Sequence, residues 1–135
     1  MTPTELNTLM TESARDAVTV TKEQFGIDLD YSSQSIENID LAITNYLDTF
    51  REQALENKAI FTLCNIYGAY LGETCKTIVG GEWRIDDSNS DAPNVFLHIN
   101  DNSYAFAGIC YEKLVNDSAI SVQAYFEAAI NNHQS

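Results

Sequence analysis

Four side chains near the middle of the chain have the residue types that could form a small-ligand site: Tyr67, Tyr70, Glu73 and Trp83. Glu73 lies in a helical segment that is otherwise short of charge. A half-buried glutamate there needs a partner such as Arg84, or its pKa is raised. Perturbed carboxyl groups are common at binding and catalytic sites. We therefore expect either a structural salt bridge at Glu73 or a small-molecule or enzymatic site formed by these four residues.

Two glycines, Gly68 and Gly72, lie four residues apart inside the same apolar helical segment. A glycine in a helix interior costs about 0.5–1 kcal/mol relative to alanine, so their presence indicates that another element approaches this backbone closely. Close packing of a helix or strand is the main interpretation. A backbone-lined slot for a ligand and a subunit interface are the alternatives.

A second candidate surface is acidic. Glu5, Glu12, Asp16 and Glu23 follow one another at offsets 0, 7, 11 and 18 along the first predicted helix, which places them on one side of it. Such a stripe is most often a solvated helix face. Together with further acids, including Asp28, it makes the N-terminal half of the chain strongly negative.

The whole chain has 20 acidic and 7 basic residues, for a formal net charge of −13. This charge repels phosphate groups, so we expect neither nucleic-acid binding nor attraction to anionic membranes. A basic protein partner would suit the charge. Solubility or life in a salty cytoplasm is the alternative explanation.

The residues that usually carry catalysis or bind metals do not form a recognisable set. His98 and His133 have no local partners for a triad or a metal site. The segment Asp87–Asp91 matches the first half of a calcium loop, but Ala92 replaces the required glycine and His98 replaces the closing glutamate. We predict no catalytic residue, no metal and no cofactor.

The three cysteines, Cys64, Cys75 and Cys110, are odd in number and lack metal-site spacing, which favours reduced, buried thiols. On one helix, Cys64 and Cys75 would be about 16 Å apart, too far for a disulfide. No apolar run has the length of a membrane span, and the N-terminus lacks secretory-signal features. We expect a cytoplasmic protein, or a mature chain whose signal has been removed.

Hydrophobic periodicity predicts the elements. Helices are expected over 2–25, 33–52 and 53–79, the last with a possible break near Asn57, and strands over 82–85, 95–99 and 104–106. A short helix over 108–115 and a final helix ending near Ile130, capped within Asn116–Ser118, complete the chain. This order predicts a single α+β domain over 1–135, with a helical N-terminal half packed on a small antiparallel sheet.

The segment from Tyr67 to Trp83 resembles a family of small bacterial domains of unknown function. The resemblance is carried by a YGxYLGE-like helix and a GGxW-like entry into a short sheet, which correspond here to Tyr67-Gly68-x-Tyr70-Leu71-Gly72-Glu73 and Gly80-Gly81-x-Trp83. It covers about 28–130 and implies an α+β domain without an agreed activity. The family pattern also implies basic residues around Lys113, which stands nearly alone in this chain.

The leading hypothesis is a non-enzymatic acidic protein-binding module directed at a basic protein, for example an immunity-like or antitoxin-like protein. Its candidate surface is the stripe Glu5, Glu12, Asp16 and Glu23, extended by Asp28 and Asp30. The alternative is a small-molecule-binding or enzymatic domain that uses Tyr67, Tyr70, Glu73 and Trp83. A third hypothesis is an oligomer formed through the Gly68/Gly72 face; the sequence does not specify the oligomeric state.

Overall fold

Long helices come first in the chain and a small sheet follows them. A computed structural model describes residues 2–86 and 94–134. The elements in order are α1 (Pro3–Phe25), a 3₁₀ turn η1 (Ser33–Ser35), α2 (Ile36–Ala54), α3 (Asn57–Val79), β1 (Glu82–Asp86), β2 (Asn94–Ile99), β3 (Asn102–Tyr104), α4 (Phe106–Tyr111), a π-helical turn η2 (Glu112–Asn116) and α5 (Val122–His133). The protein is α+β with a helical N-terminal half, which confirms the predicted fold class.

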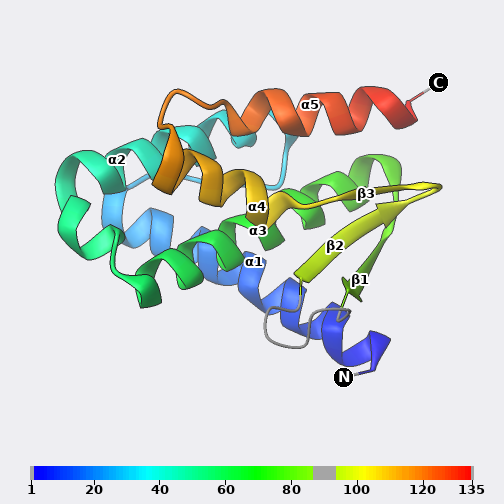
Figure 1. Ribbon diagram of the computed structural model, residues 1–135. Helices are drawn as coiled ribbons and strands as arrows, with labels where there is room; N and C mark the ends of the chain where they lie inside the picture. Colours follow the sequence, from blue (N-terminus) through cyan, green and yellow to red (C-terminus); the bar gives the residue numbers. More distant parts are fainter. Residues whose placement is uncertain (1, 87–93, 135) are drawn as a thin grey trace.

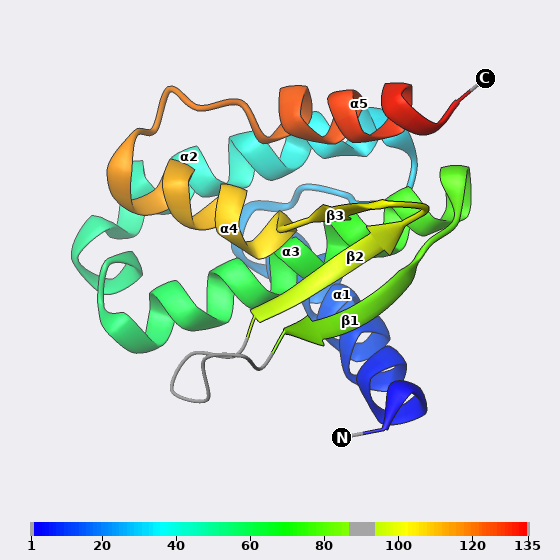
Figure 2. The ribbon, with the colours of Figure 1, turned by 45° about the vertical axis from the view of Figure 1, so that its right-hand side comes forward.

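Helix α3 crosses the middle of the molecule, with α1 on one side and α4 and α5 on the other (Figure 1). Its central segment Ile66–Gly72 is buried throughout, as its apolar sequence predicts. Figure 2 shows the sheet beside the C-terminal half of α3, with β1 on the side of α1. The two termini of the described chain lie at the same end of the molecule, on opposite sides of the sheet.

Helix α1 begins and ends at residues that suit these positions. The Thr2 hydroxyl accepts a hydrogen bond from the Glu5 N–H, and the Glu5 carboxylate accepts one from the Thr2 N–H, which forms a capping box. Gly26 ends the helix in the left-handed conformation, with φ 66°. Both helix ends agree with the prediction.

The sheet has the order β1-β2-β3, and both pairs are antiparallel. Trp83 pairs with Leu97, and Leu97 pairs with Tyr104, so these three residues form a row across one face of the sheet. All three are buried. Residues on the same face of neighbouring strands interact directly, and this row therefore attaches the sheet to the helical core.

The two glycines of α3 allow the close approach that their spacing predicted. A Cβ at Gly68 would lie 2.7 Å from the Ala107 backbone of α4, and a Cβ at Gly72 would overlap the ring of Trp83. The glycines of α3 therefore serve to pack α4 on one turn and the tryptophan on the next.

Several boundaries differ from the predicted ones. The third strand is present but begins two residues earlier than predicted: β3 spans Asn102–Tyr104, and Phe106 starts α4. Helix α5 starts at Val122 behind a Ser121 cap, rather than within 116–118, and it extends to His133. Helix α3 starts at Asn57, the position of the predicted break, and residues 53 and 54 belong to α2, which continues to Ala54 through a kink at Phe50 (φ −130°, ψ 37°). Helix ends depend on caps and packing, which periodicity does not show.

All three cysteines are free and buried, as predicted. Burial raises the pKa of Cys64 to about 12 and that of Cys75 to about 11, so these thiols stay protonated in the folded protein. Among the described residues, no helix combines the length and the apolar character that crossing a bilayer requires.

Candidate functional site

Glu73 is tied into the fold by three contacts. Its carboxylate accepts hydrogen bonds from the Trp83 indole N–H at 2.8 Å and the Thr11 hydroxyl at 3.1 Å, and Lys76 Nζ lies 3.2 Å away. Glu73 thus has the structural salt bridge that we expected, but its partner is Lys76 and not Arg84. Arg84 pairs with Glu82 instead, because Trp83 and Arg84 point to opposite faces of β1 and only Trp83 faces the core.

Tyr67 and Tyr70 are fully buried, and their hydroxyls have internal partners. The Tyr67 hydroxyl lies 2.7 Å from the Thr21 hydroxyl of α1. The Tyr70 hydroxyl accepts a hydrogen bond from the Tyr31 N–H at 2.7 Å and lies 2.6 Å from the Ser35 hydroxyl. Burial raises the pKa of both tyrosines, which keeps them neutral. Their hydrogen bonds attach α3 to α1 and to the segment before α2.

The four residues Tyr67, Tyr70, Glu73 and Trp83 therefore do not surround a common open site. Each contacts other parts of the protein, and the two cavities described below are lined by other residues. Their arrangement is what a packing role requires, since a buried polar atom without a partner would be costly.

The acidic residues predicted on the first helix are all exposed on α1: Glu5, Glu12, Asp16 and Glu23. Glu5 is used in the capping box, and its hydrogen bonds to Thr2 lower the pKa of its carboxyl group. Within residues 2–86 and 94–134, no ion pair or hydrogen bond involves the side chains of the other three. The charges of these three residues are therefore directed at solvent over about 17 Å of helix.

The acids that follow α1 are held locally. Asp28 pairs with Lys22 at 2.9 Å. The Asp30 carboxylate accepts hydrogen bonds from the Ser32 hydroxyl at 2.6 Å and the Ser32 N–H at 3.1 Å, which lowers the pKa of Asp30. Both residues are exposed, so they extend the negative surface beyond the end of α1.

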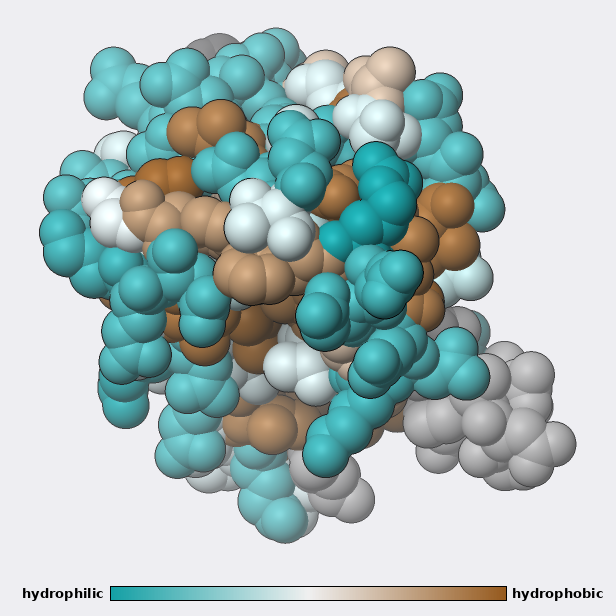
Figure 3. All heavy atoms as spheres, turned by 90° about the vertical axis from the view of Figure 1, so that its left-hand side faces the viewer, coloured by the Kyte–Doolittle hydropathy of each residue, from teal (hydrophilic) through white to brown (hydrophobic). Residues whose placement is uncertain are grey.

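A groove that the sequence did not predict lies where the C-terminal end of α2 meets the start of α3. Its volume is about 530 Å³, and it is lined by Gln24, Tyr46, Phe50, Gln53, Ala54, Glu56, Lys58, Ala59, Thr62 and Leu63. We call it the α2–α3 groove. Figure 3 views this end of the molecule, where hydrophobic side chains lie at the surface among hydrophilic ones. A second hollow of about 320 Å³ lies between η1, the end of α3 and α5.

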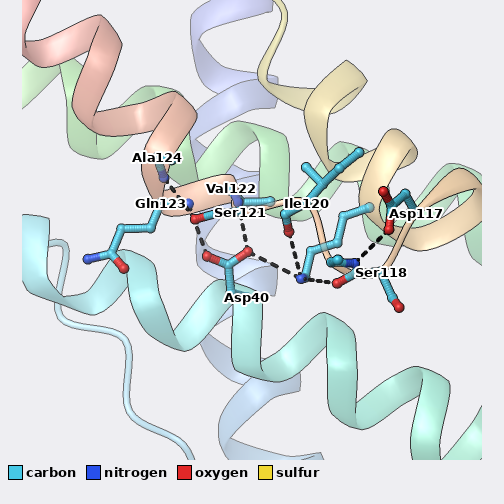
Figure 4. Close-up of polar contacts among 10 residues, drawn as sticks. Asp40, Asp117, Ser118, Ile120, Ser121, Val122, Gln123 and Ala124 are labelled. Atoms are coloured by element: carbon cyan, nitrogen blue, oxygen red, sulfur yellow. Dashed lines mark hydrogen bonds and ion pairs between the residues drawn. The ribbon is translucent and has the colours of Figure 1, made fainter.

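The sequence also did not predict the contacts between Asp40 and the start of α5 (Figure 4). The Asp40 carboxylate accepts hydrogen bonds from the Val122 N–H at 2.7 Å and the Gln123 N–H at 3.0 Å. The first N–H groups of a helix have no partner within the helix, and the helix dipole favours a negative charge there. An aspartate of α2 thus caps α5 from a distance of 82 residues along the chain.

Lys113, in η2, completes this cluster. Its ammonium group donates to the Ser118 and Ile120 carbonyl oxygens at 2.7 and 2.8 Å and lies 3.6 Å from the Asp40 carboxylate. Its exposed fraction is 5%. Two of the three ammonium donors are used in these hydrogen bonds, and the Asp40 carboxylate supplies the opposite charge. A single lysine in an apolar, lysine-poor segment was the one sequence signal that could have indicated this cluster.

The histidines remain separate. His98 Nδ1 lies 3.0 Å from the Ser103 hydroxyl on the neighbouring strand, and His133 Nε2 lies 2.8 Å from the Tyr104 hydroxyl. In the described parts of the chain, no group of three or more His, Cys, Asp or Glu side chains is placed to hold a metal ion. The calcium-loop pattern at 87–91 lies outside the described residues.

Comparison with known proteins found no matching family model, no similar curated protein and no similar solved structure. The resemblance of Tyr67–Trp83 to small bacterial domains of unknown function therefore stays a prediction.

Proposed function

We propose that the protein is a non-enzymatic, acidic protein-binding module that acts in the cytoplasm on a basic protein partner, in the manner of an immunity or antitoxin protein. The observation that carries the proposal is the stripe on α1. Glu12, Asp16 and Glu23 are exposed and have no ion pair in the described chain, although other acids of the protein do.

The net charge of −13 supports the same partner class. A negative surface accelerates association with a positive one by long-range attraction and disfavours other acidic proteins. A stripe confined to about 40° of one helix presents its charges in a single direction, which suits a surface contact. The alternative site at Tyr67, Tyr70, Glu73 and Trp83 lacks a comparable observation, since these side chains have internal partners.

The experiment is a pull-down from a lysate of the source cells at low and high salt, followed by binding measurements with the captured protein. We expect a basic protein whose affinity falls steeply as salt rises. The variant Glu12→Gln/Asp16→Asn/Glu23→Gln should weaken its binding about tenfold or more.

The matched control is Glu37→Gln/Asp48→Asn/Glu127→Gln, which removes the same number of charges from exposed positions on α2 and α5. It should change the affinity much less than the α1 variant does. Capture of no salt-sensitive partner, or equal weakening by the two variants, would contradict the assignment to α1.

A further inference from the structure

We infer that the α2–α3 groove is the apolar half of the partner-binding surface and that it binds an amphipathic helix of the basic protein. The inference rests on the proposed function and adds where and how the partner docks. Three observations carry it: the shape and lining of the groove, its charged rim, and its position relative to the acidic stripe of α1.

The groove has two apolar walls. Tyr46, Phe50 and Ala54 follow one another at four-residue intervals on α2, and Ala59 and Leu63 do the same on α3. The α2 wall is about 12 Å long and bends at the Phe50 kink. A groove between two helices with walls of this length fits the i, i+4, i+7 side chains of an amphipathic helix.

Two exposed apolar residues are next in sequence to residues that line the groove. Phe61 of α3 has an exposed fraction of 71%, the highest among the large hydrophobic residues of the described chain, and Leu55 in the turn between α2 and α3 has 38%. Leu55 lies between the lining residues Ala54 and Glu56, so it adds exposed apolar surface at the turn between the two walls.

The rim favours a basic occupant. Glu56 lines the groove, and the exposed Glu23 and Glu52 directly precede the lining residues Gln24 and Gln53. Lys58 is the basic residue among those that line it. Glu23 is also the last member of the α1 stripe, so the stripe ends beside the groove. One basic partner could therefore contact both, with its charges on α1 and its apolar side chains in the groove.

The test uses two fluorescent peptides of about 18 residues with the same Leu and Lys composition. In one, the leucines follow i, i+4, i+7 spacing; in the other they are scrambled. By fluorescence anisotropy at low salt, we expect the wild-type protein to bind the ordered peptide about tenfold tighter than the scrambled one, because only the ordered helix presents its apolar side chains together.

Two variants fill the groove: Thr62→Trp and Gln53→Trp, at exposed lining positions on α3 and α2. Either should remove the preference for the ordered peptide and leave binding of the scrambled peptide unchanged. The matched control, Ala128→Trp on the exposed side of α5, should keep the preference. Having two filling variants keeps the test valid if one of them fails to fold.

Different failures overturn different statements. Salt-dependent binding of both peptides without a preference, or a preference that both filling variants retain, would overturn the groove and leave the proposed function standing. Absence of salt-dependent binding to either peptide would contradict the basic partner, and with it the proposed function. A dimer that Gln53→Trp dissociates in light scattering would overturn the proposal in favour of a second copy of the chain.

Discussion

The carboxylates inside this protein and those on α1 differ in what they contact. Asp40 and Glu73 each contact another element of the fold: Asp40 caps α5 and lies beside Lys113, and Glu73 accepts hydrogen bonds from Thr11 of α1 and Trp83 of β1. The carboxylates of Glu12, Asp16 and Glu23 have no comparable contact in the described residues. The same residue types thus have a structural role in one region and are available to a partner in the other.

This difference shows that net charge alone is a poor guide to a binding surface. A carboxylate with several hydrogen bonds is already satisfied, and releasing it to a partner would cost the fold those bonds. An exposed carboxylate without partners loses only hydration when it binds. The α1 stripe is therefore the better candidate surface, and the following predictions test the contrast with the interior.

The largest effect is expected at Lys113. Lys113→Met keeps most of the packing but removes the donor to the Ser118 and Ile120 carbonyls and the positive charge beside Asp40. We expect the free energy of unfolding to fall by about 3 kcal/mol in urea denaturation, because two backbone carbonyls lose their donor and the partly buried Asp40 loses its positive neighbour. Lys58→Met, at an exposed lysine of α3, should change it by less than about 0.5 kcal/mol. Equal effects would contradict the structural role of Lys113.

A smaller effect is expected at Glu73. Glu73→Gln retains an acceptor for the Trp83 N–H but loses the charge that faces Lys76, so stability should fall by about 1 kcal/mol. Trp83 is the only tryptophan, and its fluorescence emission should shift with the change of its partner. Glu82→Gln, next to Trp83 but paired with Arg84 at the surface, should leave the emission unchanged. Unaltered emission in Glu73→Gln would show that the indole does not depend on this carboxylate.

On α1 the effect on stability should be close to zero. Glu12→Gln/Asp16→Asn/Glu23→Gln removes three exposed charges without breaking an internal bond, so the free energy of unfolding should change by less than about 0.5 kcal/mol. Thermal and urea denaturation measure it. A loss comparable to that of Glu73→Gln would mean that these acids have a structural role, and the contrast between the two regions would fail.

Asp30 combines features of the two groups of carboxylates: it is exposed, like those on α1, but it accepts two hydrogen bonds from Ser32. Its pKa is lowered in the folded state, so the stability it contributes is present above the unfolded pKa and is lost as pH falls through the folded one. The difference in unfolding free energy between wild type and Asp30→Asn should be constant above about pH 4 and shrink below it. A difference that is the same at about pH 3 and pH 6 would contradict this linkage.

The sequence was sufficient for most of the elements. The capping box at Thr2 and Glu5, the stop at Gly26 and the change of periodicity after Gly80 are local patterns, and the structure confirms each of them. The third strand and the start of α5 were placed wrongly. Their limits depend on the pairing of β3 with β2 and on the cap that Asp40 provides from α2, which local sequence does not contain.

For the candidate site, too, the sequence predicted the local features and not the long-range contacts. The exposure of Glu12, Asp16 and Glu23 followed from helical spacing alone. The partner of Glu73 did not, because it depends on which face of β1 is turned toward α3. The α2–α3 groove was missed entirely, since it arises where the kink at Phe50 and the turn at Leu55 bring the ends of two helices together.

By itself, the sequence determined the α+β order of elements, the acidic face of α1 and the close approach at Gly68 and Gly72. These features depend on residue type and spacing along one element, and both can be read directly from the sequence. Only the tertiary structure decided which carboxylates are satisfied internally and where an apolar groove remains open. Both depend on contacts between segments that lie far apart in sequence. These contacts form together when the whole chain packs, so no single segment of the sequence specifies them.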